Sequence, residues 1–537
     1  MNNRRTPPSA ALSLGAAIRA AYAAGQEDEA LEPIVKTRLD GAPIGRIGRG
    51  DVVIFYDIRG EREIEITQSL TDPAFSHFAV ERDLGLHFVT MIDYDPSLDV
   101  RAAFPRDGKI RATLAEVVSR AGLRTAKIAE SEKAAHIGFF LNGKSEEIFP
   151  GEERTIVPSP EGLANYDERP EMSAAAVAEA VARKIAEPGT ALALIIANLA
   201  NVDVVGHIEN RAAVVRAVEA VDAALGRIAA AAEAAGAVLI VTADHGTVEE
   251  WTYPDGTVNT GHTANAVPFI LADFGSLKPA AGFAVRSAGE LADVAPTVLD
   301  ILGLATPSEM TGRSLLVEHG RRAAGRRVVV LILDGWGEGD GGAGDLIAGA
   351  RTSHFDALRA RFPQARLEAS GEAVGMPPGT VGNSEAGHLH LGAGRRVFLD
   401  RVRIDRAIRD GSFAANPVFG KAMARARDSR RPLHLMGIIS HYSSHGTIDH
   451  LFALLAMARE AAVPEVYVHG FIGRRGERPE SGALYVEKVE EECRRLGAGE
   501  VVTVLGRYWS LDREGNWDRV EKAYRALVHG EGTRVGG

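Results

Sequence analysis

The sequence predicts an α/β fold with mostly parallel sheets. Short apolar runs typical of buried strands alternate with longer segments that have helical spacing. Several runs end in a polar residue that a loop would present, and ligands gather at the carboxyl ends of parallel strands. The chain has 537 residues, which is too long for one ordinary core and predicts roughly two to four domains.

The expected elements can be placed along the chain. The predicted strands are 51–60, 191–200, 237–246, 266–275, 327–337, 431–440, 464–473 and 500–509. Between them, the alanine-rich segment 211–236 has the spacing of a long helix. The charged segment VEHGRRAAGRR, residues 317–327, predicts a linker.

Composition excludes several classes of protein. A hydrophobic content of 45% and a charged content of 25% are typical of soluble globular proteins. A net charge of -11 argues against wholesale nucleic-acid binding, so an anionic substrate needs a local arginine cluster. The single cysteine, Cys493, excludes an intramolecular disulfide and a cysteine-rich zinc site. No apolar run reaches the roughly 18 residues of a membrane span, and Arg19 interrupts the alanine-rich start, favouring an amphipathic helix over a signal peptide. We therefore expect a cytoplasmic protein with neither membrane nor nucleic-acid partners. A monomer is a separate expectation that composition does not address.

Carboxylates and imidazoles recur beside the predicted strands: Asp203, His207, Asp244, His245, His262 and Asp334. Asp203 and His207 are four residues apart, so a helical turn would place them on one face. Asp244 and His245 are adjacent after a strand, where a loop can direct them to two different metals. Mixed Asp and His ligands suit Mn²⁺ or Zn²⁺ better than Mg²⁺. Together these residues predict a dinuclear metal site.

Ser384 lies in GNSEAGH, among small residues that let a substrate approach closely. A serine hydroxyl is a weak nucleophile at neutral pH and needs a base or a metal to activate it. The segment is not the G-x-S-x-G elbow of serine hydrolases, so metal activation is the better account. The sequence thus predicts a two-metal phosphoryl-transfer centre with a serine nucleophile.

The motifs VLILDGWG, SGEAVGMPPGTVGNSEAGHLHLGAGR, NVDVVGH, TADHG and GHTANAVPF resemble the cofactor-independent phosphoglycerate mutases of the alkaline-phosphatase superfamily. Segments such as HLMGIISH, VYVHGFIG and SEMTGRSLL extend the resemblance over nearly the whole chain. It implies an alkaline-phosphatase-like metal domain with a smaller α/β substrate domain. The implied reaction is an isomerisation through a phosphoserine, on phosphoglycerate or a related phosphorylated or phosphonylated three-carbon acid.

The order of these segments differs from that of the family, whose members begin at the DGWG strand and end soon after the EMTGRSL-like stretch. Here that ending runs through the linker into DGWG, which indicates a circular permutation. We expect the metal domain to comprise 108–325 and 326–398, the latter with the serine. We expect the substrate domain to comprise 399–537 together with 1–107.

The resemblance also implies roles for individual residues. One metal would be bound by Asp203, His207 and His262, and the other by Asp334, Ser384, Asp244 and His245. Ser384 would be the nucleophile, Lys133 would stabilise the transferring phosphoryl group, and His445 matches an active-site histidine. The substrate-binding residues would be Arg59, Arg62, Arg475, Arg507 and Arg513, whose guanidiniums suit carboxylates and phosphates. The two metals would be Mn²⁺, with Zn²⁺ or Mg²⁺ as alternatives.

Two loops depart from the family pattern. In 441–446, HYSSHG stands where the family has DGGVHSH, and in 473–478, GRRGER stands where it has DGRD, with Gly476 at the aspartate position. This predicts a substrate that differs near the glycerate end, or else that Glu477 or His441 replaces the aspartate. A phosphatase or other hydrolase of the same superfamily is the alternative function. A non-catalytic homologue is the least favoured, because every implied metal ligand is present.

Overall fold

The chain forms two compact units in the computed structural model: a small unit of Met1–Arg106 and Arg403–Gly537, and a large unit of Asp107–Val402. The structure describes residues 13–105, 109–189, 191–253, 255–275, 283–318, 327–441, 443–473, 478 and 480–536. The predicted linker therefore lies largely outside the described residues, as does Arg475. No helix in the described ranges is both long and apolar enough to cross a membrane.

The large unit is built on one sheet with the strand order β10-β12-β9-β8-β11-β7-β5-β6. Its strands are β5 (Arg124–Glu130), β6 (Glu152–Val157), β7 (Leu192–Leu199), β8 (Val238–Thr242), β9 (Val267–Asp273), β10 (Ala288–Glu290), β11 (Val328–Leu333) and β12 (Gln364–Glu368). The strands from β8 through β11, β7 and β5 to β6 pair in parallel, whereas β9 is antiparallel to β8 and to β12. The central strands are buried along their whole length, as parallel strands covered on both faces require.

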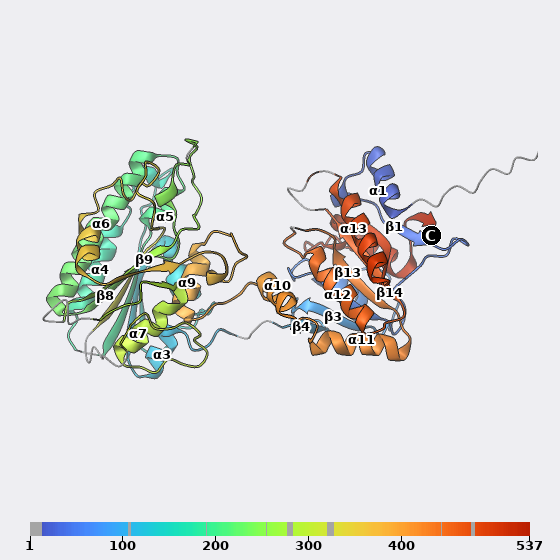
Figure 1. Ribbon diagram of the computed structural model, residues 1–537, viewed down its shortest axis with the longest axis horizontal. Helices are drawn as coiled ribbons and strands as arrows, with labels where there is room; N and C mark the ends of the chain where they lie inside the picture. The colour runs from blue at the N-terminus through green and yellow to red at the C-terminus, as the bar shows by residue number, and fades with distance from the viewer. Residues whose placement is uncertain are drawn as a thin grey trace, which may run out of the picture. The chain divides into compact units, whose positions relative to one another are not determined.

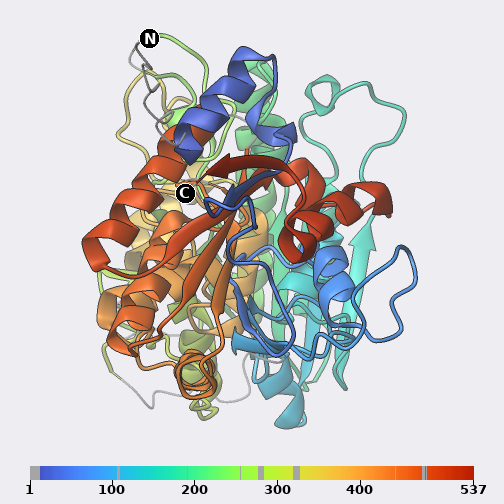
Figure 2. The same ribbon diagram turned by 90° about the vertical axis from the view of Figure 1, so that its right-hand side faces the viewer.

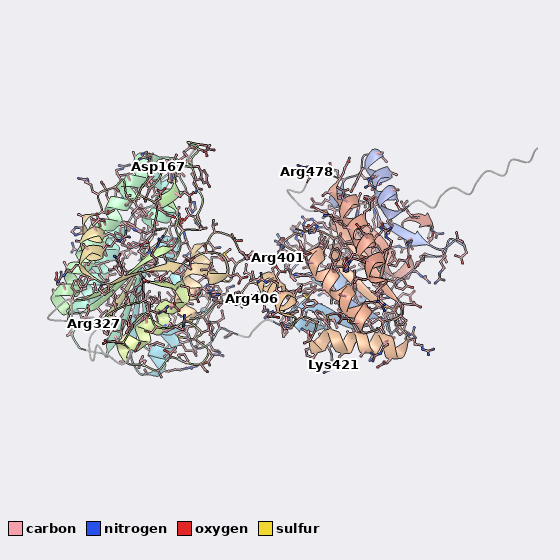
Figure 3. All side chains as sticks on the ribbon, viewed as in Figure 1. Asp167, Arg327, Arg401, Arg406, Lys421 and Arg478 are labelled. Carbon is pink, nitrogen blue, oxygen red and sulfur yellow. The ribbon has the colours of Figure 1, made fainter. Side chains whose placement is uncertain are left out.

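Helices cover both faces of this sheet (Figure 1). They are α3 (Leu114–Arg120), α4 (Ala174–Ala186), α5 (Asn201–Gly206), α6 (Arg211–Ala235), α7 (Val294–Leu302), α8 (Ser353–Arg361) and α9 (Ser384–Ala393). The predicted long helix is confirmed as α6. Asn210 caps its start by accepting a hydrogen bond from the backbone N–H of Ala213, and Asp167 (Figure 3) in turn accepts one from the Asn210 side chain at 2.9 Å. Gly236 ends α6 with a φ of 60°, a conformation that glycine adopts without strain.

The small unit has its own sheet, with the strand order β16-β1-β15-β14-β13-β2-β3-β4. Its strands are β1 (Ile34–Thr37), β2 (Val52–Phe55), β3 (His87–Ile92), β4 (Arg101–Phe104), β13 (Leu433–Ile438), β14 (Val466–Ile472), β15 (Glu500–Gly506) and β16 (Thr533–Gly536). From β15 to β4 every pair is parallel. β1 pairs in parallel with β16, so segments from the two ends of the chain lie side by side in this unit (Figure 2).

The helices of the small unit are α1 (Leu14–Ala23), α2 (Ile64–Thr71), α11 (Pro417–Ser429), α12 (Ile448–Glu460), α13 (Ser481–Leu496), α14 (Arg507–Ser510) and α15 (Trp517–Tyr524). Helix α10 (Asp400–Asp410) runs across the boundary between the units along the chain. The helix expected near the N-terminus is confirmed as α1, which buries Leu14, Ile18 and Tyr22. All the strands predicted above are confirmed, and so is the α/β fold class.

Candidate metal centre

Three neighbouring strands of the large unit bring the predicted ligands together. β7, β11 and β8 lie side by side in parallel, so their carboxyl ends meet at one edge of the sheet. Asp334 directly follows β11, Asp244 and His245 follow β8, and Asp203 lies in α5 after β7. The fold therefore unites residues that stand far apart in the sequence.

Glycine at position 335 lets the backbone pass close to α5. Its φ is +79°, and a Cβ there would lie 2.8 Å from the backbone nitrogen of Asp203. The backbone N–H of Gly335 also donates to Asp244 Oδ1 at 3.2 Å. The first glycine of DGWG thus holds two of the predicted ligand segments at contact distance.

Lys133 contacts predicted ligands of both metals. It ends a short 3-10 turn, Ser131–Lys133, directly after β5, and its side chain is only 4% exposed. Its Nζ donates to Asp203 Oδ2 at 2.7 Å, to Asp334 Oδ1 at 2.7 Å and to Ser384 Oγ at 2.8 Å. Burial lowers the pKa of Lys133, but the Asp334, Asp203 and Asp244 carboxylates outweigh burial and raise it, so the ammonium stays charged.

Asp203, His207 and His262 form the first ligand group. The Nε2 atoms of both histidines lie 3.2 Å from Asp203 Oδ1 and 3.2 Å from each other. Their Nδ1 atoms face the backbone carbonyls of Thr260 at 2.7 Å and Gly382 at 2.8 Å. A carbonyl that accepts the Nδ1 proton leaves Nε2 free to bind a metal, which is the usual support of a metal-binding histidine.

The second group surrounds Ser384, the first residue of α9. Its Oγ lies 2.9 Å from His245 Nε2 and donates to Asp334 Oδ1 at 3.2 Å. Asn383 caps α9 by accepting from the backbone N–H of Ala386, which fixes the position of the serine. The structure thus places every predicted ligand of the large unit at one centre, together with Lys133. Oxygen and imidazole nitrogen donors of this kind fit two divalent ions. Asp203, His245 and Asp334 also have ligand atoms close enough together to hold one ion.

Sequence reasoning missed two further residues of this centre. His388 and Asn198 are both fully buried. Asn198 Nδ2 donates to Asp334 Oδ2 at 2.6 Å and lies 3.0 Å from His388 Nε2, while His388 Nδ1 lies 3.2 Å from Asp244 Oδ2. His388 is one helical turn after Ser384 in GNSEAGH, so its spacing was a signal; Asn198 lies within an apolar strand, and nothing nearby marks it.

Four of the five predicted arginines, Arg59, Arg62, Arg507 and Arg513, lie in the described part of the small unit. The Arg59 guanidinium donates to Glu61 and to Ser444 Oγ at 3.1 Å, and that of Arg513 donates to Glu61 at 2.7 Å. Burial, with the nearby charges of Arg513, Arg507 and Arg59, lowers the pKa of Arg62. Four of the five predicted arginines therefore cluster, which makes a local positive region on an otherwise acidic chain.

His445 also lies in the small unit, where its side chain is fully buried. Its Nδ1 is 2.7 Å from Glu63 Oε1, and Asp57 completes a buried group of possible metal ligands. The predicted catalytic role of His445 stays a prediction. Its pairing with Glu63, 382 positions away, had no signal in the sequence.

Comparison with known protein families identifies the superfamily of this chain. Residues 20–306, more than half of the chain, match the Metalloenzyme superfamily. The chain belongs to the Metalloenzyme superfamily. A second match, over residues 404–536, is to the family described as the BPG-independent PGAM N-terminus. The fold that the resemblance implied, a metalloenzyme domain with a second α/β domain, is thus confirmed.

The curated relatives that the chain matches are named 2,3-bisphosphoglycerate-independent phosphoglycerate mutases. The protein of Moorella thermoacetica is 44% identical over 305 residues, which cover 56% of this chain and 57% of the relative. That of Thermomicrobium roseum is 47% identical over 307 residues, with the same shares. A solved structure titled as Leishmania mexicana phosphoglycerate mutase is 27% identical, covering 52% of this chain and 53% of that one at a TM-score of 0.35. The chain spans somewhat over half the length of the curated relatives it matches.

Proposed function

We propose that this chain is a metal-dependent mutase that transfers a phosphoryl group through a phosphoserine at Ser384. The observation that carries the proposal is the position of the Ser384 hydroxyl. It lies within 3.2 Å of Lys133 Nζ, His245 Nε2 and Asp334 Oδ1, at the helix N-terminus that begins with it. A nucleophile surrounded by metal-ligand types and one ammonium suits attack on an anionic phosphoryl group.

The reaction that we propose has two displacements. Ser384 Oγ loses its proton as it attacks phosphorus, the new O–P bond forms as the bond to the substrate oxygen breaks, and the departing oxygen takes up a proton. A different hydroxyl of the same acid then loses its proton as it attacks the phosphoserine, and the released Ser384 oxygen takes up a proton. Lys133 donates to the serine and to two carboxylates, so it is placed to stabilise charge on the transferring group.

We further propose that this centre binds two divalent ions, with Mn²⁺ preferred. Asp203, His207 and His262 would hold one ion, and Asp334, Asp244, His245 and Ser384 the other. Such ions lower the pKa of a bound hydroxyl and neutralise phosphoryl charge. The mixture of carboxylate and imidazole donors favours Mn²⁺ or Zn²⁺ over Mg²⁺.

The proposed substrate is phosphoglycerate or a related three-carbon acid, as the names of the relatives suggest. We assign the binding of its anionic groups to Arg59, Arg62, Arg507 and Arg513, and by sequence alone to Arg475. Bidentate guanidiniums match carboxylate and phosphate oxygens. A cytoplasmic location and a monomeric state also remain predictions.

We further propose that the chain is a circular permutation of the mutase order. A family described as an N-terminus matches residues 404–536, after the metalloenzyme match at 20–306. Alignments that cover only 56% of this chain are what a collinear comparison with a reordered protein would give. Moving the segment that begins near residue 327 to the front, with the present ends joined, should preserve activity; a reordered chain that folds but is inactive would contradict the proposal.

Phosphorus NMR on the full chain with Mn²⁺ and a panel of phosphorylated and phosphonylated three-carbon acids tests the function. We expect isomerised product without net release of phosphate, and loss of at least a thousandfold in rate for Ser384→Ala. Ser353→Ala is the matched control, because Ser353 also begins a helix but is exposed. Release of free phosphate at the rate of substrate loss would instead indicate a hydrolase, and no turnover of any acid would overturn the proposal.

A further inference from the structure

The small unit has a second group of ligand-type side chains at the point where its sheet changes direction. From β13 the chain proceeds outward through β14 to β15, and from β2 it proceeds outward on the other side through β3 to β4. β13 and β2 are therefore the parallel neighbours at which the strand order reverses. In open α/β sheets, ligands bind outside the carboxyl ends of the strands at this switch point.

Three side chains meet there, and we name them the switch-point cluster: Asp57, Glu63 and His445. Asp57 and Glu63 follow β2, and His445 lies in the loop after β13. Each offers a possible ligand atom, and these atoms all lie within 4.8 Å of one another. All three side chains are fully buried.

Two atoms of the cluster are buried without a hydrogen-bond partner. Asp57 Oδ1 accepts from the backbone N–H of Ile438 at 2.8 Å, but Asp57 Oδ2 accepts nothing. His445 Nδ1 lies 2.7 Å from Glu63 Oε1, but His445 Nε2 has no partner. Buried polar atoms of this kind are rare in native proteins and call for an explanation such as a bound ion.

The charge of the cluster also lacks compensation. Among the described residues, neither carboxylate forms an ion pair with a lysine or arginine, and Glu63 contacts only the imidazole of His445 in an acid–base pair. Arg62 gives Glu63 only its backbone N–H, at 3.2 Å, because its guanidinium donates to the carbonyl of Leu511. Burial of two carboxylates in this way is strongly unfavourable unless a cation or protons neutralise them.

We propose that the switch-point cluster is a binding site for a divalent transition-metal cation, separate from the metal centre of the large unit. Two carboxylates and one imidazole supply the donor atoms, which favours Mn²⁺ or Zn²⁺ over Mg²⁺ and Ca²⁺. The ion neutralises the buried carboxylates and joins the loops that follow β2 and β13. Its position at the switch point stabilises the loop that carries Arg59 and Arg62.

Metal content of the full chain tests the site without any assay of activity. After loading with Mn²⁺ and dialysis, elemental analysis of the double variant Asp203→Asn with Asp334→Asn should still find about one ion per chain. Adding Glu63→Gln to that variant should remove it, whereas adding Glu61→Gln should not, because Glu61 is exposed and pairs with arginines. A double variant that holds no manganese, while it remains folded by circular dichroism, would overturn the proposal and indicate that the cluster shares protons instead.

A second measurement needs no variant. In a crystal of the unaltered chain grown with Mn²⁺, anomalous scattering should give a peak bounded by Asp57, Glu63 and His445. A crystal with peaks at the large-unit centre but none at the switch point would overturn the proposal. Neither measurement depends on turnover. Both therefore test the switch-point site independently of the proposed phosphoryl transfer at Ser384.

Discussion

The metal centre of the large unit and the switch-point cluster of the small unit are both carboxylate–imidazole groups at the ends of parallel strands, but they differ in charge compensation. In the large unit, the Lys133 ammonium donates to Asp203 and Asp334. In the small unit, Asp57 and Glu63 have no such cation among the described residues. The difference indicates that the large-unit centre can persist without its metals, whereas the switch-point cluster needs an added cation or protons.

Replacing Lys133 by methionine should have the largest effect on activity and stability. It removes the ammonium that distinguishes the metal centre of the large unit from the switch-point cluster. We expect kcat to fall by about a hundredfold to a thousandfold, because the proposed mechanism loses the donor that stabilises the transferring group. The metal-free chain should lose about 3–5 kcal/mol of stability, because its buried carboxylates become uncompensated. Steady-state kinetics and thermal unfolding with and without Mn²⁺ measure both, and added Mn²⁺ should offset much of the stability loss.

Lys127→Met is the control for that substitution. Lys127 is also a fully buried lysine, within β5, but it pairs with Glu152 at 3.3 Å, outside the metal centre. It should lose stability with little change in kcat. Equal losses of kcat in the two variants would mean that Lys133 acts only through folding.

Substitution of His388 should show how much the metal affinity of the large-unit centre depends on residues that contact its ligands. His388→Ala removes the imidazole beside Asp244 and Asn198, so we expect Mn²⁺ affinity to fall about tenfold to a hundredfold. Competition with a fluorescent chelator measures the affinity. His390→Ala, a buried histidine of the same helix that accepts from the backbone N–H of Val397, should leave it unchanged; a similar loss there would contradict a specific supporting role.

Glu130 provides a buried carboxylate of the large unit outside the metal centre. Burial raises its pKa to about 7. The native state therefore retains a proton that the unfolded chain releases near pH 4.5, so the contribution of Glu130 to stability falls as pH rises from about 4.5 to 7. In Glu130→Gln this fall in stability, roughly 3 kcal/mol, should disappear. Unfolding at pH 5 and pH 8 measures it, and identical pH dependence in both proteins would show that Glu130 is not the group responsible.

The smallest effect should come from Glu61, the exposed neighbour of the switch-point cluster. Its ion pairs with Arg59 and Arg513 are solvent-exposed, so Glu61→Gln should change stability by less than about 1 kcal/mol. Thermal unfolding of the Mn²⁺-loaded chain compares it with Glu63→Gln, two residues away but buried. If Glu61→Gln loses as much stability as Glu63→Gln, the exposed and the buried carboxylate of this loop do not differ in their contribution to stability.

The sequence by itself determined the eight strands named above, the long helix and the candidate ligands of the metal centre, because each is encoded in a local pattern. Apolar runs specify strands, and the ligands stand directly beside them in NVDVVGH, TADHG and DGWG. Only the tertiary structure decided which polar residues face these ligands from other elements. Asn198 supports Asp334 from the neighbouring strand β7, and Glu63 meets His445 across 382 positions. Such contacts follow from strand order, which places carboxyl ends side by side, and no local pattern records that order.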